Sequence, residues 1–549
     1  MADIADDNRL LNDWHQRMAV GIKLSNDGDL PKAEQIFRDI LQLTPPQPIL
    51  ATAHHNLGIC LLHQGRSNEA KDSLVEAIRL EPTYAQAHRS LGGLLHAEED
   101  EDGAEFHLRK ALSLNKSDAE ALNNLGAVLN ARRKYSEAII LLRQAIRLQP
   151  ALVDAYNNLG ISFTGIGALR TARKWLEKAL DLDPHNAAAH ANLGNVYKEA
   201  KRTSEALACY EIALSISPNT VTTRWNRSLA LLQAGNFEEG WKEYEWRWRR
   251  RSTPPRKLLF PHWQGEELQG KSILLHAEQG LGDTIQFIRY ASVLKHQGAN
   301  VVFECPQPLV ELLRGCHGVD VLVPEGANLP EVDFHSPLMS LPRLCGTTLA
   351  TIPAPIPYIE VDPAKVSRWR EAIFHVVIPR AVRVGIAWQG NPNHPWDSFR
   401  SVPLREWQPL LHTPGVQFFS LQTGPGVEQL DAIKNERLVN PLELILQPAD
   451  MADLAALIQN MDVILSVDTA TAHLAGALRA QTWILVAAIS DWRWLQDRDD
   501  TPWYPSVRLF RQRSLRNWSQ LFARVKAELT AFATSRRLSA ATLTQGVMQ

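Results

Sequence analysis

Small and apolar residues recur in the first half of the chain with a constant period of 34 positions. A Leu-Gly pair occurs five times at this interval, and an alanine follows each glycine after 12 residues and again after 19. The small residues let the two helices of a helix–turn–helix unit approach closely. Neither helix can bury its apolar face until a neighbouring unit stacks on it. The pattern therefore predicts an α-solenoid.

After residue 252 the pattern changes to short apolar runs that alternate with helical stretches. The runs predict strands at 271–276, 301–304 and 319–323, and after a proline-rich crossing the alternation restarts at 382–388, 416–421, 463–467 and 482–487. Strands that alternate with helices predict a parallel sheet, and the restart predicts a second one. Two such lobes predict a cleft at the carboxyl ends of their strands, closed by hinge motion.

The two patterns divide the chain into six segments. We expect an N-terminal tail at 1–13, about seven repeats at 14–251 and a linker at 252–268. The first α/β lobe is expected at 269–378, the second at 379–535, and a C-terminal tail at 536–549. The first lobe is the expected acceptor side and the second the expected donor side.

The 34-residue unit resembles the tetratricopeptide repeat. The Leu-Gly pair and the two alanines carry the resemblance, together with a closing proline at Pro82, Pro150, Pro184 and Pro218. Less regular copies flank the five clear ones. Stacked repeats of this kind curve into a superhelix whose concave groove binds extended peptides or partner segments.

An asparagine precedes the Leu-Gly pair in most repeats. Its amide can accept a hydrogen bond from one peptide N–H and donate one to a peptide C=O. A column of asparagines on the inner surface would hold an acceptor polypeptide by its backbone, and it resembles the column of the nucleocytoplasmic protein O-linked sugar transferases. The alternative is that asparagine is simply part of the repeat consensus. The expected acceptor-binding residues are Asn56, Asn124, Asn158, Asn192 and Asn226.

Composition narrows the choice of partners and of compartment. Lys+Arg 58 against Asp+Glu 60 gives a net charge of -2, which excludes a whole-protein electrostatic case for nucleic acid or acidic membranes. The five cysteines are scattered, the first residues are acidic rather than basic, and the strongest apolar run, 483–489, is too short for a membrane span. We expect a reduced, cytoplasmic protein. The basic and aromatic run at 241–251 is interpreted as a helix that packs on the next domain with its arginine heads solvated.

Two motifs in the second half resemble glycosyltransferase family 9, the heptosyltransferase-like enzymes. They are Gly280-Leu-Gly-Asp283 and Val467-Asp-Thr-Ala-Thr-Ala-His-Leu474. The resemblance implies a two-lobed α/β domain of the GT-B type, with twin Rossmann-like lobes. It also implies inverting transfer of a sugar from a nucleotide donor, with no metal ion and no cofactor. With the repeats, the chain resembles bacterial glycosyltransferases some of which are proposed to modify proteins such as flagellin.

The second motif is the expected donor site. Asp468 ends an apolar strand, and Thr469, Ala470 and Thr471 begin a helix whose free N–H groups and dipole favour a phosphate. His473, one turn further on, could reach a phosphate or ribose oxygen. The alternative is an ordinary N-cap before a core helix. Heptosyltransferases usually have Gly-Pro where this chain has Ala470-Thr471, so the identity of the donor stays open.

Asp283 is the expected catalytic base. It lies where the first strand of the first lobe turns into its first helix, and an inverting transfer needs a base for the proton of the acceptor. The base of the family corresponds to this position. Glu278 and His276, in the same loop, are rival bases, and capping of the helix is the alternative role for Asp283.

Further donor-binding candidates follow the strand ends of the second lobe. Gln389, Asn391, Arg400 and Gln422 are the expected residues, and Arg400 is the cation best suited to a diphosphate. The run Asp491-Trp-Arg-Trp494 could wall the nucleotide or acceptor pocket, or its tryptophans could be core, and Arg493 is its more interesting member.

The expected function is transfer of a sugar from a nucleotide-sugar donor to an acceptor, such as a hydroxyl of a flagellin-like protein presented by the repeats. Two alternatives remain open. One is a non-catalytic scaffold with a degenerate transferase domain, and the other is a transferase that acts on saccharide or lipid acceptors.

Overall fold

The computed structural model describes residues 2–43, 45–250, 254–353, 355–394, 396–433, 437–444 and 450–546. These residues form two compact units. Unit 1 comprises Met1–Tyr197 and Glu211–Pro218, and unit 2 comprises Lys198–Tyr210 and Asn219–Gln549. Each unit is described by itself.

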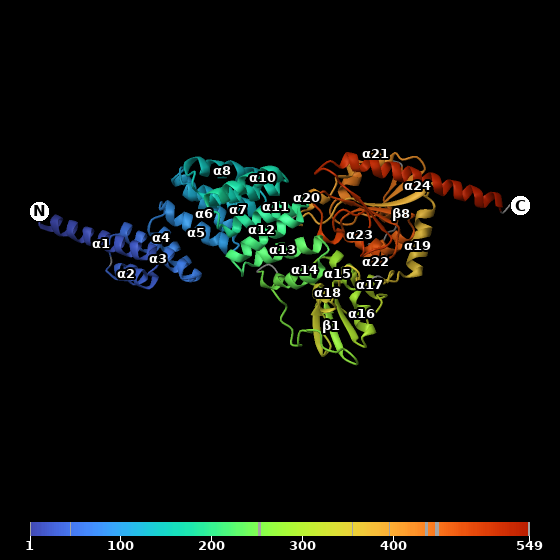
Figure 1. Cartoon of the computed structure of the whole chain (residues 1–549), viewed down its shortest axis with the longest axis horizontal. Coiled ribbons are helices and arrows are strands. Elements are labelled where there is room, and N and C mark those ends of the chain that lie inside the picture. Colours follow the sequence, from blue (N-terminus) through green and yellow to red (C-terminus); the bar gives the residue numbers. More distant parts are fainter. Residues whose placement is uncertain are drawn as a thin grey trace. The chain divides into compact units, whose positions relative to one another are not determined.

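Unit 1 is a run of helices in which each helix packs on the next (Figure 1). The predicted helical solenoid is therefore confirmed. Two helices, α11 (Ala187–Glu199) and α12 (Thr203–Ile216), continue across the division between the units. The helices before them are α1 (Ala2–Asn26), α2 (Leu30–Gln42), α3 (Gln47–His63), α4 (Ser67–Leu80), α5 (Ala85–Ala97), α6 (Glu101–Leu114), α7 (Ala119–Ala131), α8 (Tyr135–Leu148), α9 (Val153–Gly165) and α10 (Leu169–Leu182).

The recurring small residues lie where the two helices of a repeat touch. A Cβ built at Gly92 in α5 would lie 2.7 Å from Leu108 Cγ and 3.2 Å from the carbonyl oxygen of Ala104, both in α6. Ala104 itself is fully buried. Glycine and alanine are thus required at these positions because a larger side chain would push the helices apart.

Two adjacent glycines in α5 give a direct test of this packing. Gly92→Ala is expected to lower the free energy of unfolding by about 1–3 kcal/mol, because the new methyl group has no space. Gly93→Ala is expected to raise it by about 0.5–1 kcal/mol, since its Cβ would meet only Asn124 Nδ2 at 3.6 Å and alanine favours a helix. Urea unfolding of the full chain, followed by circular dichroism, measures both. Equal effects at the two positions would contradict the packing argument.

Both predicted tails lie in helices. The segment 2–13 is part of α1, and residues 536–546 are part of α24 (Trp518–Gly546). Neither segment contains a proline, so nothing in the sequence interrupts a helix there. Residue 1 and residues 547–549, also assigned to the tails, lie outside the described residues.

Unit 2 contains two parallel sheets, as predicted. The first has the order β3-β2-β1-β4 and the second the order β10-β9-β8-β5-β6-β7. Three strands that the apolar runs did not predict, β4, β7 and β10, extend these sheets. The strands are β1 (Ser272–His276), β2 (Asn300–Cys305), β3 (Val321–Pro324), β4 (Phe334–Pro337), β5 (Val382–Ala387), β6 (Val416–Ser420), β7 (Leu438–Val439), β8 (Val463–Val467), β9 (Thr482–Val486) and β10 (Val507–Arg511).

The predicted linker is partly built into the first lobe. The backbone N–H of Trp263 donates to the carbonyl of His335 in β4, and the N–H of His335 donates to the carbonyl of Pro261. Trp263 and Leu268 are buried in the core. These apolar side chains anchor a segment whose prolines alone predicted a linker. Residues 252 and 253 lie outside the described residues.

The last helical pair also belongs to unit 2. It consists of α13 (Val221–Gln233) and α14 (Phe237–Tyr244), followed by the 3-10 helix η1 (Glu245–Arg249). Trp241 and Tyr244 are buried in the same hydrophobic core as residues of the two α/β lobes. The predicted packing of the basic and aromatic run is therefore confirmed. The expectation that all its arginine heads are solvated is wrong for Arg247, which is 1% exposed.

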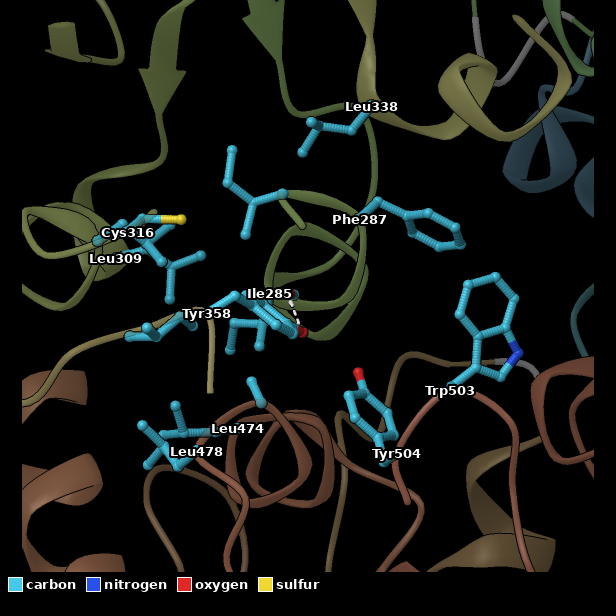
Figure 2. Close-up of a cluster of buried hydrophobic side chains, with 14 of the residues drawn as sticks. Ile285, Phe287, Leu309, Cys316, Leu338, Tyr358, Leu474, Leu478, Trp503 and Tyr504 are labelled. Carbon is cyan, nitrogen blue, oxygen red and sulfur yellow. Dashed lines mark hydrogen bonds between the residues drawn. The ribbon is translucent and has the colours of Figure 1, made fainter. Parts of the chain in front are cut away.

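The two α/β lobes share one hydrophobic core. Helix α15 (Leu281–Phe287) of the first lobe packs on α23 (Ala470–Ala477) of the second. Figure 2 shows Ile285 and Phe287 on one side of this core and Leu474 on the other. This apolar contact favours the arrangement of the lobes seen here, and the hinge motion expected between them stays a prediction.

A buried arginine adds polar contacts across the same boundary. Arg289 is 2% exposed and donates from Nη1 to the carbonyl of Trp503 and from Nη2 to the hydroxyl of Tyr358. Its guanidinium also lies 4.8 Å from the ring centroid of Tyr504. The contacts with Trp503 and Tyr504 therefore join the first lobe to the second.

Candidate functional site

The two motifs singled out in the sequence meet at the junction of the lobes. Strand β1 leads into α15, and strand β8 leads into α23. A Cβ built at Gly282 in α15 would lie 3.0 Å from His473 Cδ2 and 3.5 Å from Ala470 Cα. Glycine at 282 therefore lets the first turn of α15 rest on the first turn of α23.

Asp283 lies in that first turn of α15. One carboxylate oxygen accepts from the backbone N–H of Gly280 at 2.9 Å, so the alternative capping role is confirmed. The other oxygen accepts from Arg493 Nη2 at 2.5 Å. Burial raises the pKa of the Asp283 carboxyl above its ordinary value, and the charge of Arg493 opposes this only in part. A carboxylate with a raised pKa is a stronger base.

Arg493 links this carboxylate to the second lobe. It lies in the 3-10 helix η7 (Trp492–Trp494), after β9. Its Nη1 donates to Asp491 at 2.9 Å and its Nε to Gln286 at 2.8 Å. The guanidinium is stacked 4.4 Å from the ring centroid of Trp492. Three of the five N–H groups of a guanidinium are thus engaged by described residues.

Asp468 follows β8 and is a second buried carboxyl. Burial and then the neighbouring Asp491 carboxylate raise the pKa of Asp468 to about 6, against the opposing charges of Arg400 and Arg493. The pKa of Asp491 stays below its ordinary value, because Arg493 outweighs the effect of burial. The Asp491 carboxyl therefore loses its proton at a lower pH than the Asp468 carboxyl does.

His473 is held as a neutral imidazole. Burial, and then Arg493, lower the pKa of His473 to about 3. Its Nδ1 lies 3.0 Å from the Tyr504 hydroxyl, its ring stacks on Trp494, and its Nε2 lies 4.0 Å from Asp468. A neutral His473 can donate or accept a hydrogen bond but supplies no positive charge.

Thr469, Ala470 and Thr471 form the start of α23, as the motif predicted. Thr469 is the N-cap residue, and its hydroxyl lies 3.1 Å from that of Ser466 rather than capping the helix. The first N–H groups of any helix lack partners within it. The turn therefore presents backbone donors next to Asp468 and Gly282.

Arg400 joins the same cluster. It lies in the short helix α20 (Asp397–Arg400), where its Nε donates to Asp397 at 3.3 Å. Its positive charge opposes the rise in the pKa of Asp468. Burial, and then the charge of Arg400, lower the pKa of His394 to about 4. Two arginines, Arg400 and Arg493, thus act on the carboxyls around α23.

Gln389, Asn391 and Gln422 differ from this cluster. The Gln422 amide accepts from the backbone N–H groups of Trp388 and Gln389 and donates to the carbonyls of Gln389 and Pro425, so it holds loops together. The Gln389 amide oxygen accepts from Gln429 at 2.6 Å. Asn391 is exposed and caps its own loop. These amides contact neighbouring loops, and their expected role in donor binding stays a prediction.

Of the two rival bases, Glu278 is hydrogen-bonded to Arg247 and His276 is a weak base. Glu278 accepts two hydrogen bonds from Arg247, both at 3.0 Å, and one from the backbone N–H of Met339. His276 is buried beside His335, and burial lowers the pKa of His276 to about 3. Asp283 is the candidate that contacts the junction of the lobes.

The asparagine column is partly engaged within the solenoid. Asn158 Nδ2 donates to Asn123 Oδ1, and Asn192 Nδ2 donates to Asn157 Oδ1, each at 2.9 Å, so these amides connect adjacent repeats. Asn56 donates to the carbonyl of Thr52. All five expected residues, which include Asn124 and Asn226, are partly exposed, but Asn226 lies in unit 2 and the others lie in unit 1.

Sequence reasoning gave too little weight to Arg493 and Asp491. The sequence predicts only that their run could wall a pocket, with Arg493 as its more interesting member. The available signal was an aspartate and an arginine that alternate with tryptophans shortly after an apolar strand, the position where parallel sheets bind ligands.

Two searches of the described ranges bear on the expected partners. No group of three or more His, Cys, Asp or Glu side chains there is arranged to hold a metal ion. None of the helices there has both the length and the apolar character of a membrane span.

Comparison with known proteins concerns the repeats above all. Family models described as tetratricopeptide repeat match residues 51–84, 119–149 and 187–220, and one described as TPR repeat matches 162–201. Protein FlbA of Caulobacter vibrioides is 29% identical over an alignment of 335 residues, and the match covers 56% of this chain. The chain covers 55% of the length of FlbA.

Solved structures of repeat proteins are also similar to part of the chain. The Cut9–Hcn1 hetero-tetramer of the APC/C is 22% identical, over 41% of this chain and 45% of that one, with a TM-score of 0.37. A thermophilic TPR protein of Thermus thermophilus is 21% identical, over 33% of this chain and 99% of that one, with a TM-score of 0.31. The repeats predicted from the 34-residue period are confirmed by the family models, and the chain is a tetratricopeptide-repeat protein.

Proposed function

We propose that unit 2 is a GT-B-type glycosyltransferase that moves a sugar from a nucleotide-sugar donor to an acceptor hydroxyl. One observation carries the proposal. The first turn of α15, which holds Asp283, lies against the first turn of α23, where backbone N–H groups and Arg400 and Arg493 favour an anion. A base and a site for an anionic leaving group are therefore adjacent.

The proposed step needs both groups. Asp283 takes the proton of the acceptor hydroxyl, whose oxygen lone pair forms the bond to the anomeric carbon. The bond from that carbon to the diphosphate breaks, and its electron pair leaves with the nucleoside diphosphate. The dipole of α23 and the guanidinium groups stabilise this charge. Attack opposite the leaving group inverts the anomeric centre, and the step calls for no metal ion.

The repeats supply the proposed acceptor specificity. Tetratricopeptide repeats suggest a role in protein binding, and four of the expected asparagines are partly exposed in unit 1. The oxygens of Asn124 and Asn192 already accept from Asn123 and Asn195, but an amide oxygen has a second lone pair that can accept from a peptide backbone. We therefore propose a polypeptide, such as a flagellin-like protein, as the acceptor.

The direct test uses the full chain and an extract of cells that lack its gene. Radiolabelled UDP-, GDP-, ADP-, CMP- and dTDP-sugars are added in turn, and mass spectrometry locates the modified residue. Label in a polypeptide that depends on the added chain supports the proposal. Label only in saccharide or lipid would overturn the choice of acceptor, and no transfer together with no nucleotide binding would overturn the enzyme.

The raised pKa of Asp468 leads to a pH-dependent prediction. Binding of nucleoside diphosphates is expected to weaken as the pH rises through about 6, because the carboxyl is neutral below that value and repels the ligand above it. Removal of this repulsion is expected to strengthen the binding of nucleoside diphosphates about tenfold. His473 stays neutral over this range, because its pKa is about 3.

Calorimetry with UDP, GDP and ADP from pH 5 to 8 measures this dependence. The ligand itself gains charge as the pH rises, so the comparison that matters is with Asp468→Asn at each pH. The variant is expected to bind more tightly than the wild type at pH 8 and equally at pH 5. A constant ratio between the two would contradict the assignment.

A further inference from the structure

The strongest unexplained feature of the site is the ion pair between its expected base and its most enclosed cation. Asp283 and Arg493 are 210 positions apart in the chain, yet their charged atoms lie 2.5 Å apart across the junction of the lobes. The side chain of Arg493 is 8% exposed and that of Asp283 is 22% exposed. A base whose lone pair is held by a guanidinium accepts a proton less readily.

The cluster around Arg493 contains more carboxyl groups than guanidinium groups. Four aspartates, Asp283, Asp397, Asp468 and Asp491, face two arginines in this cluster. A diphosphate that enters such a cluster must compete with carboxylates for the same guanidinium donors. Asp491 holds Arg493 through Nη1, and Gln286 holds it through Nε. The bond from Nη2 to Asp283 is the one that can be exchanged while the side chain stays anchored.

The anchoring contacts favour a small movement. Stacking of the guanidinium on Trp492 and its bonds to Asp491 and Gln286 fix the plane of the group. Arg493 also acts on Asp468 and His473, which flank the first turn of α23. An anion bound at that turn therefore lies within the electrostatic range of Arg493.

We propose that Arg493 is a positioning residue that exchanges partners during the reaction. Its Nη2 leaves Asp283 for the diphosphate of the donor, and this exchange makes Asp283 available as the base only when donor is bound. The inference rests on the proposed function. It predicts that donor binds before the acceptor hydroxyl is activated, and that Asp283 and the diphosphate compete for Arg493.

Removal of the competitor tests the exchange. Asp283→Asn is expected to bind inorganic pyrophosphate and the preferred nucleoside diphosphate about tenfold more tightly than the wild type, as calorimetry on the full chain measures. A fixed structural pair would give the opposite result, because its loss would disorder Arg493 and weaken binding. Unchanged or weaker binding by Asp283→Asn would overturn the exchange.

A double substitution separates competition from simple repulsion. Asp283→Asn with Arg493→Gln removes both partners of the ion pair, and Asp491 then also loses its bond from Arg493 Nη1. If the gain comes from Arg493, the double variant binds no more tightly than the wild type. If the gain persists in the double variant, repulsion by Asp283 explains it and the exchange is wrong. Arg508→Gln, at an exposed pair with Glu528, is the matched control and is expected to bind as the wild type does.

The outcome for the proposed function can be told apart from these results. If the wild type binds a nucleoside diphosphate and Asp283→Asn binds it no more tightly, only the proposed exchange of partners by Arg493 is wrong. Absence of pyrophosphate and nucleotide binding in every variant removes the proposed transferase and the exchange with it.

Discussion

Asp283→Asn is expected to lower the rate of sugar transfer by about 10²–10⁴-fold, the contribution of a general base. The amide cannot accept the proton of the acceptor hydroxyl, whereas burial gives the native carboxyl a raised pKa that suits this task. The fold should persist, because an asparagine oxygen can still accept from the backbone N–H of Gly280. Transfer of label to protein in the extract assay measures the rate.

Asp320→Asn is the matched control for this substitution. Asp320 lies in the same lobe, accepts from the backbone N–H of Val301 and pairs with Lys295, so it has the same two kinds of contact as Asp283. We expect full transfer from this variant. If Asp283→Asn transferred sugar as fast as Asp320→Asn, Asp283 would not be the base.

Arg247→Met is expected to lower the free energy of unfolding of unit 2 by about 3–5 kcal/mol. Arg247 is 1% exposed and joins Glu278 in the loop after β1, Glu245 in η1 and Ser340 in η3 (Leu338–Ser340). Its loss leaves the Glu278 carboxylate buried without its cation.

Urea unfolding followed by tryptophan fluorescence measures this effect. Arg249→Gln, two positions away and exposed, is the control and is expected to change the stability by less than about 0.5 kcal/mol. Arg247→Met combined with Glu278→Gln should recover part of the loss, because the side chain at 278 then carries no buried charge, although Glu245 still lacks its bond from Arg247. A loss no larger than that of Arg249→Gln would show that the buried pair contributes little.

The regular elements were predictable because their signals are local. The Leu-Gly period marks the close contact of two helices within about 16 residues, as between Gly92 and Leu108. Fully buried strands such as β8 and β9 are continuous apolar runs. Strand β4 was missed because its sequence, Phe-His-Ser-Pro, is short and polar and joins the sheet only by pairing with β1.

The site was predictable only in part, for a related reason. Asp283 and Asp468 could be chosen because each follows a strand that the sequence reveals. Arg493 stands out within its run, but the sequence could not name its partners, since Asp283 and Gln286 lie more than 200 positions away. The contacts of Gln422 could not be predicted either, because its amide accepts from the backbone of Trp388 and donates to that of Pro425, which lie in two different loops.

The sequence by itself determined the repeats, the parallel sheets and the two strand ends that hold the candidate chemistry, because periodicity and apolar runs express local burial. Only the tertiary structure decided which charges meet. It showed that α15 rests on α23, that Arg493 pairs with Asp283, that Arg247 pairs with Glu278, and that the two lobes share a hydrophobic core. These contacts join residues far apart in the chain, and the energy of a buried charge depends on all the groups around it rather than on its sequence neighbours.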